Sequence, residues 1–204
     1  GATRAVCGVG TFAEYIAVDR SQLVPAPKHL SAVQSAALPC AAVTAYRAAF
    51  TKGKIQAGQN VLITGIGGGV ALLALQLVVA AGAHVYVTGG SEAKIERAKE
   101  LGAKAGAMYR DQDWPQKLRK ALPEDRPYLD VVIDSAGGDI NVQALAAGLR
   151  HGGRIVVYGM TAVPKTTFTM RDVLTNLDLQ GMSSTSHRHH AGVCQRICRQ
   201  HSVY

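Results

Sequence analysis

The sequence lacks any apolar run long enough to cross a membrane, and its start, Gly1 to Arg4, has neither an initiator methionine nor the apolar stretch of a secretion signal. Four cysteines are scattered over 204 residues, too few for a disulfide framework. These absences argue against a membrane protein and against a disulfide-stapled secreted one, and they predict a cytoplasmic location. Because the chain enters mid-domain sequence abruptly, we also expect it to be a fragment.

Acidic residues are scarce, with 14 Asp and Glu against 22 Lys and Arg, so the formal net charge is +8. Part of this excess lies in residues 181–204, which contain three arginines and no acidic residue. The rest is spread over mixed-sign helical faces such as residues 92–100. The sequence has no aromatic residues interleaved with basic ones and no nucleic-acid-binding motif. We therefore expect a solvated surface with an unusual tail, and no nucleic-acid partner.

The most informative feature that is present is a glycine-rich turn at residues 65–71. It follows a β-like run at residues 60–64 and precedes an apolar helical stretch at 72–81. A second strand pattern at residues 84–88 completes a strand–turn–helix–strand unit of about thirty residues. Glycines let the backbone approach a pyrophosphate, and the helix behind them offers free N–H groups and the positive end of its dipole. The unit predicts dinucleotide binding.

The glycine motif can be aligned in two registers. A motif that begins at Gly65 puts the β-branched Val70 where the helix must pack closely on the strand. A motif that begins at Ile66 puts Ala71 there but loses the first glycine. We prefer the second register because close packing tolerates alanine better than valine. The alternative to both is a plain strand-to-helix turn with spare glycines.

Strand and helix patterns alternate through the rest of the chain. Strands are expected at residues 60–64, 84–88, 105–109, 129–134, 154–158 and about 177–182, and helices at 72–81, 91–101, 114–122 and 140–149. Near-continuous apolar strands that alternate with helices are typical of a parallel sheet covered on both faces. The predicted fold class is α/β, with a doubly wound parallel six-stranded sheet of the Rossmann type.

The regions outside this alternation have their own signals. Residues 11–18 alternate like a strand, and Ser31 is a candidate N-cap for an Ala-rich helix towards Phe50 that Pro39 breaks or kinks. Residues 166–169 are a candidate edge strand that could pair across a homodimer. Residues 183–204 show little apolar periodicity, so we expect an irregular, aberrant tail.

Several short motifs follow one another along the chain. They are Gly10-Thr11-Phe12-Ala13-Glu14-Tyr15, Ala36-Ala37-Leu38-Pro39, Thr44-Ala45-Tyr46, Gly68-Gly69-Val70, Lys99-Glu100-Leu101-Gly102-Ala103 and Gly152-Gly153-Arg154-Ile155-Val156. This series resembles the medium-chain dehydrogenase/reductase superfamily, in its quinone oxidoreductase and zinc-type alcohol dehydrogenase-like branches. The resemblance implies that residues 1–40 are a remnant of a β-rich catalytic (GroES-like) domain, that 41–182 form the dinucleotide-binding Rossmann domain, and that 183–204 are a tail outside both.

The end of the second strand bears on the choice of cofactor. An NAD-preferring site places an acidic residue there, but this sequence has Thr88-Gly89-Gly90-Ser91. Lys94 follows in the first helical turn, where a cation opposes the helix dipole and a capping box would favour Glu. A cation placed against the helix dipole suggests that this position binds an anion from outside the chain. We predict that Ser91 and Lys94 hold the 2′-phosphate of NADPH; the open alternative is a capping serine and a solvated lysine.

The resemblance implies further cofactor contacts. Tyr109, at the end of the third strand, would pack at the 2′-phosphate end. The residues implied at the nicotinamide end are Thr44, Ser135 and Gly137 after the fourth strand, and Tyr158 and Gly159 after the fifth. In the glycine turn the residues are Gly68, Gly69 and Val70. The alternative interpretation of residues 135–138 is a plain turn.

Zinc is a separate question. Cys40 falls where the resemblance places a late ligand of zinc-dependent alcohol dehydrogenases, but a catalytic site needs three protein ligands. The others would come from sequence that is absent here, so we expect Cys40 to be a small buried residue. The spacing of histidines and cysteines in residues 187–198 mimics a metal site, and we interpret it as accidental.

These observations predict an NADPH-dependent oxidoreductase that transfers hydride to a small-molecule substrate, namely a quinone, an enone or another carbonyl compound. No residue is an evident general acid, and Tyr46 and Tyr158 are candidates. Two alternatives remain open. One is a catalytically silent nucleotide-binding protein that acts as a redox sensor or partner subunit. The other is a zinc-dependent alcohol dehydrogenase.

Overall fold

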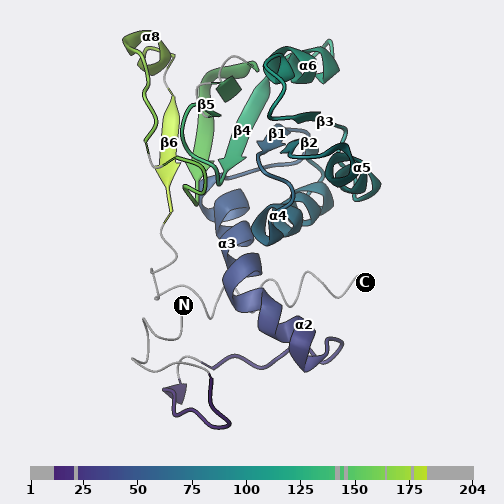
Figure 1. The fold of residues 1–204 in the computed structure, drawn as a ribbon, viewed down its shortest axis with the longest axis vertical. Coiled ribbons are helices and arrows are strands. Elements are labelled where there is room, and N and C mark those ends of the chain that lie inside the picture. The colour runs from purple at the N-terminus through teal and green to yellow at the C-terminus, as the bar shows by residue number, and fades with distance from the viewer. Residues whose placement is uncertain are drawn as a thin grey trace.

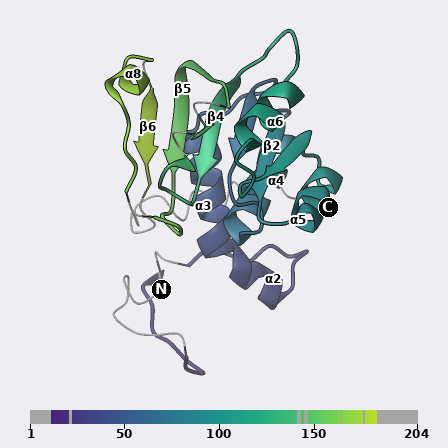
Figure 2. The same ribbon diagram turned by 45° about the horizontal axis from the view of Figure 1, so that its top comes forward.

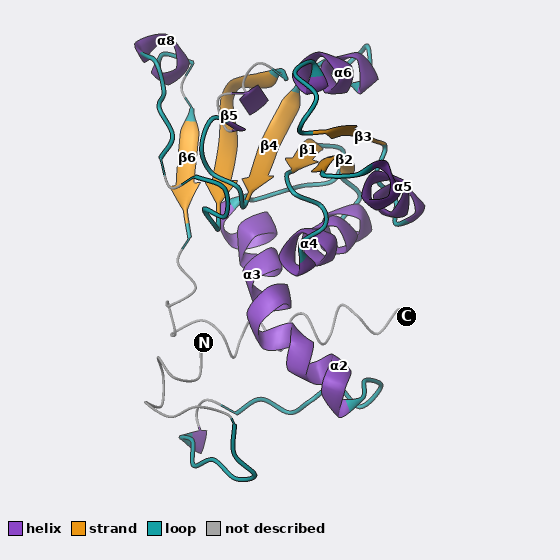
Figure 3. Cartoon of the chain, viewed as in Figure 1, coloured by secondary structure: helices purple, strands orange, loops and turns teal. Residues whose placement is uncertain are grey.

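A six-stranded parallel sheet forms the centre of the protein (Figures 1 and 3). The computed structural model describes residues 12–20, 23–140, 143–144, 147–163, 165–175 and 177–182. The strands are β1 (Asn60–Ile63), β2 (His84–Gly89), β3 (Ala105–Met108), β4 (Leu129–Asp134), β5 (Leu149–Val157) and β6 (Asp178–Gly181). Their order in the sheet is β3-β2-β1-β4-β5-β6. The predicted doubly wound α/β fold is confirmed.

Apolar clusters lie on both faces of the sheet. Along β1, Val61 and Ile63 belong to one cluster and Leu62 to the other, because successive side chains of a strand point to opposite faces. Helices α4 and α5 contribute to the first cluster and α6 to the second. Their bounds are Gly69–Ala80 for α4, Glu92–Glu100 for α5 and Trp114–Ala121 for α6. Figure 2 shows β4, β5 and β6 side by side at one edge of the sheet.

A helical rod precedes the sheet and extends away from it (Figure 1). It consists of α2 (Ala32–Ala37), the π-helical η2 (Leu38–Ala42), α3 (Val43–Tyr46) and the π-helical η3 (Arg47–Lys52). Ser31 caps it as predicted, in a capping box with Gln34. The predicted disturbance at Pro39 takes the form of the wider π turn, since proline has no N–H to donate to the preceding turn.

Two strand predictions are wrong. Residues 12–20 contain no strand, and Phe12 and Tyr15 are exposed; an alternating pattern needs a neighbouring strand for its N–H and C=O groups, and the described part of the chain provides none there. Residues 166–169 are not a strand either. Their side chains make other contacts: Thr166 donates to the Gly138 carbonyl, 28 positions earlier, and Thr169 caps the short helix α8 (Met170–Val173). The homodimer was predicted from pairing of this strand across two chains. It stays a prediction, but the strand on which it was based is not present.

The boundary before β5 also differs from the prediction. We expected a helix over residues 140–149 that ended near Gly152 and Gly153, but the strand already starts at Leu149. Residues 140, 143 and 144 are helical, and residues 147–148 form a turn. The register between β4 and β5 shifts between Leu129 and Val131, so the early part of β5 pairs irregularly. No helix in the described ranges is both long and apolar enough to span a bilayer. The predicted tail, 183–204, lies outside these ranges.

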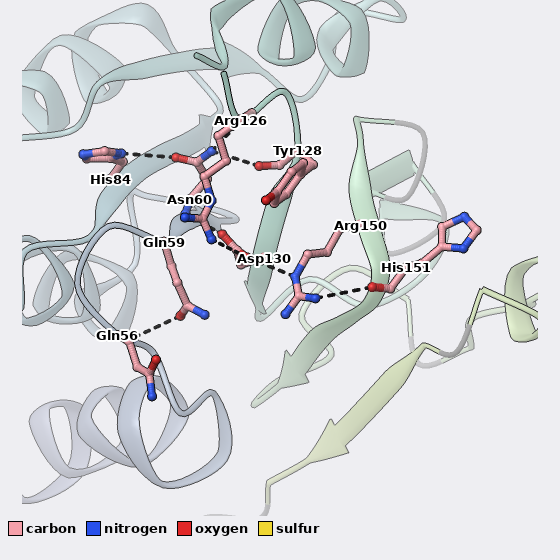
Figure 4. Close-up of polar contacts among 9 residues, drawn as sticks. All are labelled: Gln56, Gln59, Asn60, His84, Arg126, Tyr128, Asp130, Arg150 and His151. Atoms are coloured by element: carbon pink, nitrogen blue, oxygen red, sulfur yellow. Dashed lines mark hydrogen bonds and ion pairs between the residues drawn. The ribbon is translucent and has the colours of Figure 1, made fainter. Parts of the chain in front are cut away.

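The amino ends of the strands are joined by a polar network around Asp130 (Figure 4). This buried carboxylate accepts from the Asn60 backbone N–H at 2.9 Å and pairs with Arg126 and Arg150, both at 3.0 Å. The Asn60 side chain in turn donates to the Tyr128 carbonyl at 2.9 Å. The network satisfies a buried charge and fixes β1 against β4 and β5, at the end of the sheet opposite the candidate site.

Edge strand β6 is held by an ion pair that carries a pH-dependent prediction. Arg154 Nε lies 2.6 Å from Asp178 Oδ2 on the paired strand, and Arg154 Nη1 donates to the Gly53 carbonyl at 2.8 Å. A hydrogen bond from Gln180, together with Arg154, holds the pKa of Asp178 below its ordinary value. The ionised Asp178 therefore stabilises the folded chain at pH values above its pKa in the unfolded state, and this stabilisation is lost as the pH falls through its pKa in the folded state.

We expect Asp178→Asn to lower the free energy of unfolding by about 1 kcal/mol at pH 7, a value reduced for the partial exposure of the pair. The gap between variant and parent should close as the pH is lowered towards 3, because the parent then loses the same charge. Urea denaturation at several pH values measures this gap. A gap that does not change between pH 7 and pH 3 would contradict the assignment.

Candidate nucleotide-binding site

The sheet has a topological switch point between β1 and β4. The chain runs from β1 outward through β2 and β3, and then returns to the other side of β1 with β4. The connections after β1 and β4 therefore diverge to opposite sides and leave a crevice outside the carboxyl ends of these strands, where open α/β sheets bind ligands. Gly65 and Ser135, the residues just past β1 and β4, meet there: a Cβ added to Gly65 would lie 3.4 Å from the Ser135 hydroxyl oxygen.

The glycine-rich turn leads from β1 into α4 at this crevice. Gly65 adopts a positive φ of 64°, which glycine tolerates best, and its N–H donates to the Thr88 hydroxyl. Gly68 is the N-cap of α4 and, having no side chain, leaves the first N–H groups of the helix uncapped. A Cβ added to Gly69 would have no heavy atom within 4 Å. The turn thus presents free donors and the positive end of a helix dipole to open space.

Packing supports the preferred register of the glycine motif. Ala71 is fully buried in the cluster between α4 and the sheet, whereas Val70 is only partly buried. The small residue therefore occupies the close-packed position, as the register that begins at Ile66 requires. Gly65 supplies the tight turn just before that motif.

Lys94 and Ser91 lie at the start of α5, next to the glycine turn. A Cβ added to Gly67 would lie 3.0 Å from both Cδ and Nζ of Lys94, so the lysine side chain folds back over the turn. Ser91 has the extended backbone of an N-cap but makes no side-chain cap hydrogen bond. No ion pair of Lys94 occurs among the described residues. A cation and a free hydroxyl thus adjoin two helix N-termini, which favours an anion there.

Tyr109 lies just past β3 and reaches across to the end of β2. A Cβ added to Gly90 would lie 2.7 Å from the Tyr109 hydroxyl oxygen, so the ring lies against the Gly90 backbone. Tyr109 therefore lies next to the residue that precedes Ser91, and its packing at the 2′-phosphate end of a cofactor stays a prediction. A side chain at position 90 would require the exposed Tyr109 ring to move.

A buried carboxylate that the sequence analysis did not single out organises the turn after β4. Asp134 is fully buried and accepts from the Thr64 hydroxyl at 2.6 Å, the Ala136 N–H at 3.0 Å and the Gly137 N–H at 2.9 Å. It joins the ends of β1 and β4 and shapes the turn that contains the predicted residues Ser135 and Gly137. An acidic residue that follows an apolar run at the carboxyl end of a strand is the sequence signal that could have identified it.

Tyr158 and Gly159 follow β5 on the other side of this turn. A Cβ added to Gly159 would lie 2.9 Å from the Ser135 carbonyl oxygen, so the two segments pack backbone to backbone. Burial raises the pKa of the Tyr158 phenol, and a hydrogen bond with Ser135 offsets part of that rise. The phenol therefore keeps its proton at neutral pH. The Ser135 carbonyl also accepts from Thr161, which ties the turn after β4 to the segment after β5.

The remaining predicted residues lie on the helical rod. The Thr44 hydroxyl donates to the Cys40 carbonyl at 2.7 Å, within its own helix, so its contact with a cofactor stays a prediction. Tyr46 packs on Phe50, with ring centroids 4.9 Å apart. Cys40 is exposed, so the expectation that it is buried is wrong. It sits on the π turn that Pro39 begins, where the described chain has no layer packed over it.

Cys40 on this helical rod was the candidate zinc ligand. In the part of the chain that the structure describes, no three His, Cys, Asp or Glu side chains lie close enough to hold a metal ion. The histidine and cysteine spacing of residues 187–198 lies outside the described residues. The described residues therefore do not supply a zinc site, and no chemical step is derived through one.

Comparisons with known proteins agree with this geometry. The family model described as "Zinc-binding dehydrogenase" matches residues 69–197. The chain is 46% identical over 176 residues to the zinc-type alcohol dehydrogenase-like protein YogA of Leptosphaeria maculans, covering 85% of this chain and 49% of that protein. It is 28% identical to the quinone oxidoreductase of Mus musculus over 190 residues, which are 91% of this chain and 57% of that protein.

A solved structure gives the same picture. The chain superposes on an NAD-dependent alcohol dehydrogenase with a TM-score of 0.81 and 31% identity, covering 93% of this chain and 55% of that one. The chain spans about half the length of these relatives. The family match includes α4 and the strands from β2 to β6, and the superposition covers most of the chain. This chain therefore belongs to the zinc-binding dehydrogenase family, within the medium-chain dehydrogenase/reductase superfamily of oxidoreductases.

Proposed function

We propose that this chain forms the nucleotide-binding part of an NADPH-dependent oxidoreductase that reduces a quinone, an enone or another carbonyl compound. The observation that carries the proposal is the ammonium group of Lys94 over Gly67, next to the uncapped Ser91 and to a β2 end without a carboxylate. An acidic residue at that end would bond a ribose 2′-hydroxyl, whereas a cation and a hydroxyl suit a 2′-phosphate.

The residues at the crevice divide between the two ends of the proposed cofactor. The open turn at Gly68 and Gly69, with the N-terminus of α4, would hold the pyrophosphate. The turn after β4, shaped by Asp134, and the segment that starts at Tyr158 would border the nicotinamide. When bound, NADPH would supply the hydride. The protonated phenol of Tyr158 is a hydrogen-bond donor at this end.

The choice of substrate class rests on the relatives. One relative is named a quinone oxidoreductase and another a zinc-type alcohol dehydrogenase-like protein. We favour a quinone, an enone or another carbonyl compound because one relative is named a quinone oxidoreductase, and a zinc-dependent alcohol dehydrogenase is the alternative. The proposal takes a small-molecule substrate and no nucleic acid.

The proposal is tested by comparing the affinities of this chain for NADPH and NADH. We expect tighter binding of NADPH, and we expect Lys94→Ala to weaken NADPH binding about tenfold, since it removes a charge-assisted contact, while NADH binding hardly changes. Fluorescence titration measures both. Lys99→Ala is the matched control, because Lys99 lies on the same helix and pairs with Glu96 at 2.7 Å. Equal affinity of the unmodified chain for the two cofactors would defeat the proposal.

A further inference from the structure

A second cation lies at the rim of the same site. Arg110 follows Tyr109, and its guanidinium carbon lies 5.7 Å from the centroid of the Tyr109 ring. The hydroxyl of that ring reaches the backbone of Gly90, next to Ser91. The tyrosine ring thus links the arginine to the end of β2. Both Tyr109 and Arg110 are exposed.

The charge of Arg110 is not neutralised by its nearest acidic neighbours in the sequence. Asp111 and Asp113 both pair with Lys117, at 2.7 Å and 3.1 Å. No ion pair of Arg110 is found in the described ranges. Two uncompensated cations, Lys94 and Arg110, therefore lie at the carboxyl ends of neighbouring strands β2 and β3, which pair directly.

The stacking geometry suits an arginine that also binds an anion. A guanidinium can lie with its face on an aromatic ring and still direct the N–H donors of its edge outward, which a lysine ammonium cannot do in the same way. Bidentate donation from such an edge matches the oxygens of a phosphate. The ring also limits the freedom of the long side chain, so less conformational entropy is lost when it binds.

We propose that Arg110, stacked on Tyr109, is a specificity-determining residue that binds the 2′-phosphate of the nucleotide together with Lys94. This inference rests on the proposed NADPH-binding function and adds a residue to it. It assigns the tyrosine a platform role for the arginine, in addition to its contact with Gly90. Because the site is exposed, the contribution of Arg110 falls as the ionic strength rises.

Two adenine nucleotides isolate the 2′-phosphate in the test. Calorimetric titration of this chain with 2′,5′-ADP and with 5′-AMP compares ligands with and without that group. We expect Arg110→Ala to weaken 2′,5′-ADP binding about fivefold, because it removes one exposed charge pair. Its affinity for 5′-AMP should stay within about twofold of that of the unmodified chain. Arg110→Lys should recover part of the lost affinity for 2′,5′-ADP. Tyr109→Phe keeps the ring, so it should bind 2′,5′-ADP more tightly than Tyr109→Leu does.

The control for net charge is Lys104→Ala. Lys104 is exposed and lies at the amino end of β3, the end opposite to the candidate site, so its loss should change neither affinity. If Lys94→Ala removes the preference for 2′,5′-ADP and Arg110→Ala does not, the role of Arg110 is refuted while the proposed function stands. If Arg110→Ala weakens both ligands equally, the residue does not read the 2′-phosphate and the inference fails. If the unmodified chain binds both ligands equally, the NADPH proposal itself fails.

Discussion

Replacing Gly68 with alanine is expected to leave the fold intact and to weaken NADPH binding by about tenfold or more, the equivalent of one charge-assisted hydrogen bond. The backbone of Gly68 is extended, with φ −85° and ψ 145°, which any residue adopts. A Cβ there would meet only the Gly65 carbonyl oxygen, at 3.5 Å. The glycine is therefore not required by the packing of the unliganded chain. An added methyl group would instead occupy space at the helix N-terminus that a pyrophosphate needs.

Gly181→Ala is the matched control for this prediction. Gly181 ends β6, at the edge of the sheet, and a Cβ there would have no heavy atom within 4 Å, so alanine fits there as well. Thermal unfolding should give similar midpoints for both variants and for the parent, while fluorescence titration should show a loss of affinity for Gly68→Ala alone. Unchanged NADPH affinity in a folded Gly68→Ala variant would mean that the turn does not hold the pyrophosphate.

The second large effect is expected from Asp134→Ala, which we predict to lower the free energy of unfolding by about 3 kcal/mol. Three donors lose their acceptor at once, namely the buried Thr64 hydroxyl and Gly137 N–H and the partly buried Ala136 N–H. Each unpaired buried donor carries a desolvation cost. The turn after β4 also loses the group that shapes it, so we expect cofactor affinity to fall even at temperatures where the variant is folded.

Urea denaturation measures the stability change, and Asp139→Ala serves as control. Asp139 is the next acidic residue along the chain and is exposed, so its removal should change stability by less than about 0.5 kcal/mol. Asp134→Asn keeps one acceptor oxygen and should fall between the parent and Asp134→Ala. A stability of Asp134→Ala equal to that of the Asp139 variant would show that the carboxylate does not organise the turn.

Much of the fold was predictable because its signals are local. The run Leu129–Asp134 is apolar on both faces of the sheet, and β4 has these same bounds. Ser31 starts its helix through a capping box only three residues long. The strand predictions failed at residues 12–18, the described part of the predicted 11–18, and at 166–169, where the alternating or β-rich pattern was real but no described neighbouring strand pairs with it. Strand formation depends on a partner, which a single segment cannot specify.

The candidate site was predicted in its residue types and less well in its contacts. The absence of a carboxylate after β2 and the presence of Lys94 were visible in the sequence. That Lys94 folds over Gly67, 27 positions earlier, was not. Cys40 was expected to be buried, but proline at 39 begins a wide turn on which it is exposed. Asp134 was missed because its contact with Thr64 spans 70 positions, and the position of Arg110 over the Tyr109 ring was not visible in the sequence either.

The sequence by itself determined the α/β class and the glycine turn, and it predicted a phosphate-bearing ligand, because periodicity, capping and the absence of an acid are properties of neighbouring residues. The tertiary structure alone decided how these parts form a site. The return of β4 to the side of β1 brings Thr64 and Asp134, 70 positions apart, within 2.6 Å of each other. Parallel pairing aligns the carboxyl ends of all strands at one edge, so groups distant in the chain converge there.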